Sequence, residues 1–257
     1  DIVPLSVTLG DFTGRDGMEV TPAKIYQHVA ECKELPKTSA VNTEEYVRVF
    51  RSWREKGYSI VHFCISSEFS SCYQNACAAA QGYANVFVVD SENLSTGQGL
   101  LVVAAAKLAE QGLSGAEIAE RVRALAPKVE ASFLIERLDY MRKGGRCSAV
   151  AALGANLLHL KPCIEVRNGK MAVCKKYRGS FEKCIRQYVK ERLDGREDIA
   201  PELAFITHAA ADANVVAAAK EEAAQYGSFE TVEETQAGCT VSCHCGPNTL
   251  GILFVRK

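Results

Sequence analysis

The sequence has almost no net charge. Its 30 lysines and arginines nearly balance its 31 aspartates and glutamates, which gives a formal net charge of -1 and a pI near 6.6. A protein that binds nucleic acid by broad phosphate neutralisation carries a marked excess of basic residues. The composition therefore argues against that class, and we expect no nucleic-acid partner.

Long apolar runs are missing as well. The uncharged stretch 147–160 is shorter than the roughly 20 apolar residues that a membrane-spanning helix needs, and it contains Ser148, Asn156 and His159. The first residues, Asp1–Leu5, do not show the basic segment followed by an apolar stretch that marks a secretory signal. We therefore expect a cytoplasmic protein without a membrane span.

Glycine-rich nucleotide-binding motifs are also absent. The chain has no Walker-type phosphate loop, and Gly97-Gln98-Gly99 lacks the third glycine of the dinucleotide fingerprint. Cysteine, in contrast, is abundant: an odd number, 11, is scattered along 257 residues, a length that forms a core without disulfides. Because a free cysteine packs as a small hydrophobic residue, reduced cytosolic thiols are the simplest interpretation.

The first half of the chain alternates strand and helix patterns. The apolar runs 59–65 and 85–90 end in polar turns and are typical of parallel strands covered on both faces. Helices are predicted before, between and after these strands, over residues 43–56, 70–82, 100–111 and 114–126. This alternation predicts a doubly wound parallel sheet in an N-terminal α/β domain, residues 1–148.

The pattern changes after Gly144-Gly145. A small-residue helix is predicted over 149–160, followed by a hairpin whose strands, 163–166 and 170–175, are joined by Asn168-Gly169. The further expected elements are helices over 181–193 and 212–226 and strands over 203–208, 229–235 and 249–255. These elements indicate a C-terminal α+β domain, residues 149–257, so the predicted fold class is α/β with two domains.

Hydroxyl side chains gather in the polar turns near the predicted strand ends. Open α/β sheets bind ligands beyond the carboxyl ends of their strands, and hydroxyls with free backbone N–H groups at helix starts suit an anionic oxygen. The turns concerned contain Thr38-Ser39, Ser66-Ser67, Ser91 and Ser95-Thr96. The same residue types also make ordinary helix caps, and spacing alone leaves both interpretations open.

The segment Ser242–Pro247 raises two sharper hypotheses. Cys239, Cys243, His244 and Cys245 are of the types that bind zinc, but three of them are consecutive, unlike the spaced ligands of common zinc sites. A Cys–His nucleophilic pair is the other hypothesis, although adjacent side chains on an extended segment point to opposite faces. His62 and His159 lie in apolar runs and are interpreted as core histidines.

Taken in order, five segments resemble the DegV family of bacterial fatty-acid-binding proteins. Residues 38–42 are similar to the family's Thr-Ser-Gln-Pro-Ser turn, 65–74 to its Ile-Ser-Ser…Ser-Gly-Thr-Tyr-Gln segment, and 88–99 to its Val-Val-Asp-Ser…Ser…Gly-x-Gly segment. Residues 138–146 are similar to its Leu-x-Tyr-Leu-x-Lys-Gly-Gly-Arg segment, and 244–248 to its His-x-Gly-Pro-Gly motif. The family usually has one further strand, ending in an Asp-Ser turn, before the part that this chain matches. The departures from the family pattern are Ala40, Val41, Ser71, Cys72 and Asn248.

The resemblance implies a non-enzymatic lipid carrier with no cofactor and no metal. Its ligand would be a long-chain fatty acid such as palmitate, stearate or oleate, with the acyl tail in a buried tunnel of the first domain. The residues implied to bind the carboxylate are Thr38, Ser66, Ser67 and His244. The residues implied to complete the polar network around it are Ser39, Ser95 and Arg146.

The resemblance also implies partners. Characterised members of the family are the lipid-binding subunits of fatty acid kinase, so the expected partners are a kinase catalytic subunit, an acyltransferase of phospholipid synthesis and a transient membrane surface. The expected location is cytoplasmic and peripheral to the membrane. Two alternatives stay open: a small-molecule hydrolase that uses Ser or Cys with His244, and a Cys/His metal-binding regulatory protein.

Overall fold

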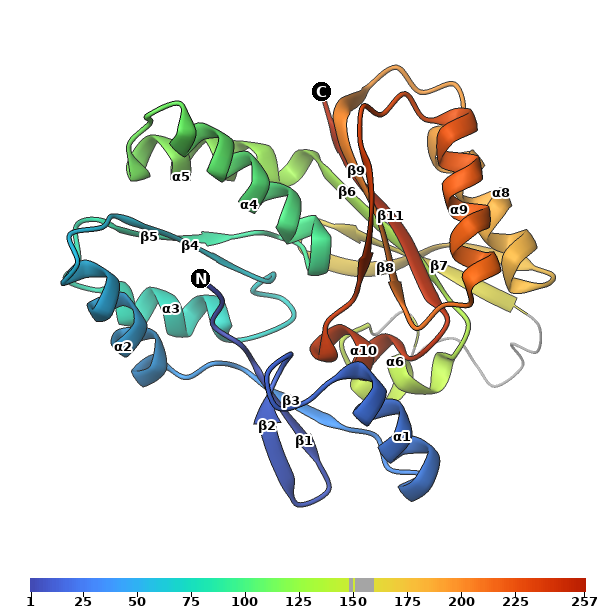
Figure 1. The fold of residues 1–257 in the computed structure, drawn as a ribbon, viewed down its shortest axis with the longest axis horizontal. Coiled ribbons are helices and arrows are strands. Elements are labelled where there is room, and N and C mark those ends of the chain that lie inside the picture. The colour runs from blue at the N-terminus through green and yellow to red at the C-terminus, as the bar shows by residue number, and fades with distance from the viewer. Residues whose placement is uncertain (148–149, 151–159) are drawn as a thin grey trace.

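The computed structural model spans residues 1–257 and describes all of them except 148–149 and 151–159 (Figure 1). The described residues form a mixed α/β fold with three sheets, one of them parallel, one antiparallel and one mixed. The helix predicted over 149–160 falls mostly outside the described residues. Leu160, its expected last residue, is instead the first residue of a strand.

The N-terminal segment forms a small antiparallel sheet that the sequence analysis did not predict. Its strands are β1 (Ser6–Leu9), β2 (Phe12–Arg15) and β3 (Lys37–Ser39), in the order β2-β1-β3, and helix α1 (Pro22–Cys32) connects β2 to β3. Strands of three or four residues show too few alternations for a period of two to stand out. The sheet matters for the site because β3 carries Thr38.

The predicted parallel strands are present as β4 (Ile60–Cys64) and β5 (Val86–Asp90), which pair in parallel. Helices α2 (Thr43–Arg54) and α3 (Cys72–Ala80) cover one face, and α4 (Ser95–Glu110) and α5 (Gly115–Leu125) cover the other (Figure 1). Successive β5 side chains point to opposite faces, so Val88 packs with α2 and α3 while Val89 packs with α4 and α5. Apolar burial on both faces explains the near-continuous apolar runs.

The larger sheet has six strands in the order β10-β9-β11-β6-β7-β8. These strands are β6 (Val129–Ile135), β7 (Leu160–Arg167), β8 (Lys170–Arg178), β9 (Ile199–Ala209), β10 (Val232–Gln236) and β11 (Thr249–Arg256). Helices α8 (Phe181–Leu193) and α9 (Ala213–Tyr226) pack on one face through a core centred on Tyr188 and Ile206. The Asn168-Gly169 hairpin is confirmed, with φ of 50° and 75° at its two central residues.

The six-stranded sheet bears on the domain boundary predicted at 148–149. Strand β6 precedes that boundary in sequence but pairs with both β7 and β11. Helix α4 joins the two halves, because Ala105 packs against the β5 side while Leu101 packs against Val129 and Leu253 of the large sheet. The boundary stays a prediction, because β6 lies before it in sequence but belongs to the same sheet as strands that follow it.

Two short helices complete the fold between the large sheet and the N-terminal sheet. They are α6 (Leu138–Gly144) and α10 (Cys239–Cys245), which lie beside each other and next to α1 (Figure 1). The segment containing His244 is therefore helical and not extended, contrary to the expectation used against a Cys–His pair. Asn248, where the family has glycine, has a φ of 53°, a left-handed conformation that asparagine tolerates better than most residues.

Candidate functional site: a polar pair at the end of an apolar cavity

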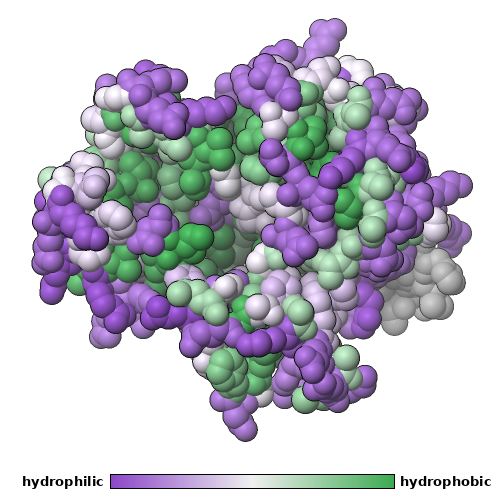
Figure 2. Space-filling view, in the orientation of Figure 1, coloured by the Kyte–Doolittle hydropathy of each residue, from purple (hydrophilic) through white to green (hydrophobic). Residues whose placement is uncertain are grey.

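A cavity of about 790 Å³ lies where the N-terminal sheet, α4 and α10 meet. Figure 2 shows hydrophobic surface at the bottom of a hollow between the parallel-sheet half and the C-terminal half of the molecule. The apolar residues that line the cavity include Ile2, Val3, Leu5, Ile65, Phe69, Val102, Val103 and Phe205. Its polar lining includes Thr38, Ser95, Arg146 and His244, four of the residues predicted from the sequence.

Thr38 and His244 form the polar centre of this cavity. Thr38 Oγ1 and His244 Nε2 lie 2.9 Å apart and share a hydrogen bond between β3 and α10. The N-terminus of α10 is fixed by Asp16, whose carboxylate accepts hydrogen bonds from the backbone N–H groups of Cys239 and Thr240, at 2.8 and 2.7 Å. A carboxylate at a helix N-terminus also interacts favourably with the helix dipole. Asp16 therefore holds the helix that positions His244.

The position of the second ring nitrogen of His244, Nδ1, explains why residue 144 in the loop Lys143–Arg146 is a glycine. A Cβ atom on Gly144 would lie 2.5 Å from His244 Nδ1, so only glycine fits at that position without moving the ring. Nδ1 itself is buried and has no hydrogen-bond partner in the described part of the chain. Arg146 donates a hydrogen bond to the Gly144 carbonyl at 2.9 Å. The Lys-Gly-Gly-Arg loop thus places a close backbone contact and a positive charge beside the same histidine.

The cavity lining carries one positive charge, that of Arg146, and one negative charge, that of Asp16, which the N-terminus of α10 binds. Burial, with a smaller contribution from the positive charge of Arg146, lowers the pKa of His244 to about 4. His244 is therefore neutral at pH 7, and the permanent positive charge at this end of the cavity comes from Arg146, which is exposed. A carboxylate here would meet the guanidinium of Arg146 and one further donor, because Thr38 and the neutral His244 share a hydrogen bond and only one of the two keeps a free proton to donate.

The structure separates Ser66 and Ser67 from this group. Ser66 is buried, and its Oγ donates to the carbonyl oxygen of Gly169 in the β7–β8 hairpin at 2.8 Å. The backbone N–H of Ser67 donates to the Asp90 carboxylate at 3.3 Å. Neither residue is part of the cavity lining, and Ser39 is exposed on β3, where it pairs with Ser6. Of the predicted site residues, the structure thus brings together Thr38, His244, Arg146 and Ser95, with Ser95 at the first position of α4.

Two serines that the sequence analysis did not select line the cavity instead. Ser70 and Ser71 lie in the turn that leads into α3. Ser70 Oγ accepts a hydrogen bond from the backbone N–H of Cys72 at 3.2 Å. The signal that identifies them is their position directly before a helix start, where side-chain oxygens meet free N–H groups.

A second cavity of about 630 Å³ lies between β4, α4 and α5. It shares with the first cavity the lining residues Ile2, Val3, Leu5, Ile65, Gln98 and Val102. Its further lining is mostly small or apolar and includes Val61, Phe63, Ala105, Ala106, Ala109 and Ile118. Because the two cavities share these lining residues, they adjoin each other, and the second lies along β4, α4 and α5.

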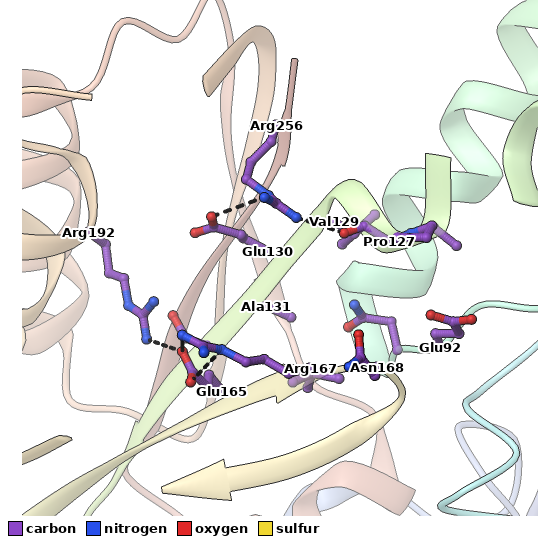
Figure 3. Close-up of a pocket in the computed structure, with 14 residues that line it drawn as sticks. Glu92, Pro127, Val129, Glu130, Ala131, Glu165, Arg167, Asn168, Arg192 and Arg256 are labelled. Carbon is purple, nitrogen blue, oxygen red and sulfur yellow. Dashed lines mark hydrogen bonds and ion pairs between the residues drawn. The ribbon is translucent and has the colours of Figure 1, made fainter. Parts of the chain in front are cut away.

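A third cavity, of about 260 Å³, has a different character (Figure 3). Its arginines pair with glutamates of the same lining: Arg167 and Arg192 both pair with Glu165, at 2.7 and 3.3 Å. Arg256 pairs with Glu130 at 3.5 Å. This small, polar and internally neutralised space does not suit an apolar ligand.

The two other hypotheses receive no support from the geometry. No group of three His, Cys, Asp or Glu side chains that could hold a metal ion occurs outside residues 148–149 and 151–159. His244 Nε2 faces Thr38 and not a thiol. Burial raises the pKa of the Cys245 thiol to about 12 and that of Cys239 to about 12, so both are protonated at pH 7 and poor nucleophiles.

Within the described residues, none of the helices has both the length and the apolar character that a bilayer crossing requires.

Comparisons with known proteins give one consistent result. The family profile described as "Uncharacterised protein, DegV family" matches residues 1–257. A DegV domain-containing protein of Clostridium acetobutylicum is 30% identical, and the match covers 100% of this chain and 91% of that protein.

Solved structures give the same answer. A DegV family protein from Thermus thermophilus, described as binding fatty acid, has a TM-score of 0.89 and 30% identity over 99% of this chain and 91% of its own. A stearic acid-binding protein from Eubacterium ventriosum has a TM-score of 0.86 and 29% identity, covering 99% and 90% of the two chains. DegV of Bacillus subtilis, described as a fatty acid binding protein, has a TM-score of 0.81 and 27% identity, covering 99% and 91%. The resemblance found in the sequence is confirmed: the chain belongs to the DegV family.

Proposed function

We propose that this protein binds one long-chain fatty acid, such as palmitate, stearate or oleate, and is itself not an enzyme. The observation that carries the proposal is the placement of the polar pair Thr38 and His244 in a cavity with a mostly apolar lining, which adjoins a second cavity. Fatty-acid ligands in relatives from Thermus thermophilus and Eubacterium ventriosum support it.

The energetics agree with such a ligand. Each methylene group moved from water into an apolar site contributes about 0.8 kcal/mol, so a chain of about sixteen carbons contributes on the order of 10 kcal/mol before ordering costs. A buried carboxylate without partners would cancel much of that gain. The guanidinium of Arg146 would supply one partner, and either the hydroxyl of Thr38 or the imidazole of His244 would supply another; Ser70 and Ser95 are in the same cavity lining.

We further propose that the carrier presents the carboxylate to a fatty acid kinase catalytic subunit. The acyl phosphate would then pass to an acyltransferase of phospholipid synthesis. In this scheme the protein is cytoplasmic and contacts the membrane surface transiently to take up its ligand. Arg146, which is exposed and lines the cavity with Thr38 and His244, is where a partner would reach the head group.

Mass spectrometry tests the binding proposal directly. Protein made in bacteria is denatured, its organic extract is analysed for fatty acids, and delipidated protein is titrated with oleate and with its methyl ester. We expect a co-purified fatty acid and a rise in melting temperature with oleate, because a ligand that binds only the folded state stabilises it. The methyl ester, which keeps the tail but has no charged head, should give a smaller rise. An empty extract together with no thermal shift would reject the proposal.

Hydroxylamine trapping tests the kinase role separately. Delipidated carrier is loaded with labelled oleate and mixed with ATP and a fatty acid kinase catalytic subunit, and acyl phosphate is counted as the hydroxamate. Formation that depends on the carrier supports the role. Equal formation without the carrier contradicts it while leaving fatty-acid binding intact.

A further inference from the structure

Two cysteines lie next to each other across the β7–β8 hairpin, away from the cavities that would hold the fatty acid. Cys174 on β8 is exposed, and Cys163 on β7 is buried. The strand register shifts here, since Cys163 pairs with Lys175 and Ile164 pairs with Val173. Cys174 is therefore the extra residue of a β-bulge, and its Sγ lies 3.4 Å from the carbonyl oxygen of Cys163.

A fixed arginine faces both sulfur atoms. Nη2 of Arg192, on α8, lies 3.1 Å from the Sγ of Cys174 and 3.8 Å from the Sγ of Cys163. The ion pair with Glu165 holds this guanidinium in place, as Figure 3 shows. A cation at hydrogen-bond distance stabilises a thiolate relative to the thiol.

The pKa values of the two thiols differ as this geometry predicts, with Cys174 the more acidic. The hydrogen bond from the Cys163 thiol and the charge of Arg192 lower the pKa of Cys174 to about 7. Burial and the charge of Glu165 act in the opposite direction but do not cancel this shift. The same hydrogen bond, together with burial, raises the pKa of Cys163. At neutral pH a substantial fraction of Cys174 is therefore thiolate, while Cys163 holds its proton.

We propose that Cys174 is an oxidation site for hydroperoxides and that Cys163 resolves it to a disulfide. The Cys174 thiolate attacks one oxygen of the hydroperoxide, the O–O bond breaks, and the other oxygen leaves as water or an alcohol after taking up a proton. The product is a sulfenic acid on Cys174. The sulfur of Cys163 then attacks the sulfur of Cys174, the S–O bond breaks, and the hydroxyl leaves as water with the proton of Cys163. The two thiols lose two electrons, and the hydroperoxide gains them.

Competitive alkylation of the full-length, reduced protein tests the first part. A short pulse of iodoacetamide at pH 7 is followed by peptide mapping, with Cys32, exposed at the end of α1, as the internal control. We expect Cys174 to react about tenfold faster than Cys32, because a larger fraction of it is thiolate. Equal rates at the two cysteines would overturn the assignment of Cys174 as the reactive thiol.

Peroxide treatment tests the second part. Trypsin cleaves after Arg167 and Lys170, between the two cysteines, so their peptides stay joined only through a disulfide. Tandem mass spectrometry then separates Cys163 from Cys147, which shares its peptide. We expect a Cys163–Cys174 link after hydrogen peroxide. Absence of this link, with Cys174 still reduced, would overturn the proposal.

Variants separate the roles of the three residues. Cys163→Ala should leave a sulfenic acid on Cys174 that dimedone traps, because no resolving thiol remains. Arg192→Gln should slow alkylation of Cys174 several-fold, and Arg192→Lys should restore much of the rate because it keeps the charge. Glu165 keeps Arg167 as a partner in both arginine variants. An alkylation rate that does not change in Arg192→Gln protein would contradict the role of the guanidinium.

Discussion

Thr38 and His244 share a hydrogen bond of 2.9 Å although 206 positions separate them in the chain. One comes from the small N-terminal sheet and the other from the short helix α10 near the C-terminus. Their contact closes the polar end of the apolar cavity, so both ends of the chain contribute to the proposed head-group site.

The first prediction concerns this contact. Thr38→Val keeps the shape of the side chain but removes the hydroxyl, so binding of oleate should weaken roughly tenfold to a hundredfold through the loss of a hydrogen bond to a charged group. Isothermal titration calorimetry on delipidated protein measures the change. Ser39→Ala, a neighbouring change on an exposed side chain outside the cavity, is the matched control and should bind oleate like the parent. Equal affinity in the Thr38 variant would move the head group elsewhere.

The second prediction concerns Ser66. The family resemblance implies that it binds the carboxylate, but in the structure its hydroxyl donates a hydrogen bond to Gly169 in the β7–β8 hairpin. Ser66→Ala should lower the free energy of unfolding by about 1 kcal/mol or more, because the buried hydrogen bond to the Gly169 carbonyl is lost. Oleate affinity of the folded protein should stay the same. Urea unfolding and calorimetry measure the two quantities, and Ser67→Ala should change neither. A large loss of affinity in Ser66→Ala would support a role of Ser66 in binding the carboxylate.

The third prediction concerns Gly144. Gly144→Ala should displace the imidazole of His244, because the new methyl group would lie 2.5 Å from Nδ1, and oleate binding should weaken at least tenfold. Gly145→Asn is the control in the same loop. Gly145 has a φ of 67°, which asparagine tolerates, and a Cβ there meets no atom within 4 Å. If the two variants bound oleate equally well, the contact between Gly144 and His244 would have no role in binding.

The fourth prediction concerns the inner cavity. Ala105→Leu should reduce the length available to the acyl tail, so the protein should lose affinity for stearate more than for laurate. Ala104, the preceding residue of α4, is outside the lining of both cavities, and Ala104→Leu should keep the parent preference. Competition with a fluorescent fatty acid compares the two chain lengths. A parallel loss for both acids would indicate general damage to the fold rather than a shorter tunnel.

The fifth prediction concerns pH and His62, which lines the inner cavity and whose Nε2 is buried without a partner among the described residues. Burial lowers the pKa of His62 to about 4, whereas an unfolded histidine titrates near 6.5. Below pH 6.5 the unfolded state therefore binds more protons than the folded state, and stability falls as the pH drops from 6.5 toward 4. His244, with its pKa also lowered to about 4, contributes in the same direction.

Urea unfolding at several pH values checks this prediction. His62→Phe, which keeps an aromatic ring against Tyr46 and Phe50, should lose less stability than the parent between pH 6.5 and 4.5. At pH 7 both proteins should carry a neutral ring at this position. A pH dependence identical in parent and variant would show that folding does not lower the pKa of His62.

Local sequence determined much of the secondary structure. The apolar runs of β4 and β5, the helix patterns around them and the Asn168-Gly169 turn are properties of a few neighbouring residues, and each was predicted from those residues alone. The motifs also sufficed to identify the family, because their order along the chain is part of the sequence itself. Strands β1 to β3 escaped prediction because their few residues carry too weak a pattern.

Tertiary structure alone decided which polar groups share the cavity. Ser66 and Ser70 lie four positions apart in similar polar turns, yet one hydroxyl bonds to the hairpin and the other residue lines the cavity. The difference comes from the placement of the β7–β8 hairpin, which belongs to a sheet formed by residues after 128. A hydroxyl's partner depends on what packs against it from elsewhere in the chain, and no local pattern records that contact. The meeting of Thr38 with His244 has the same origin.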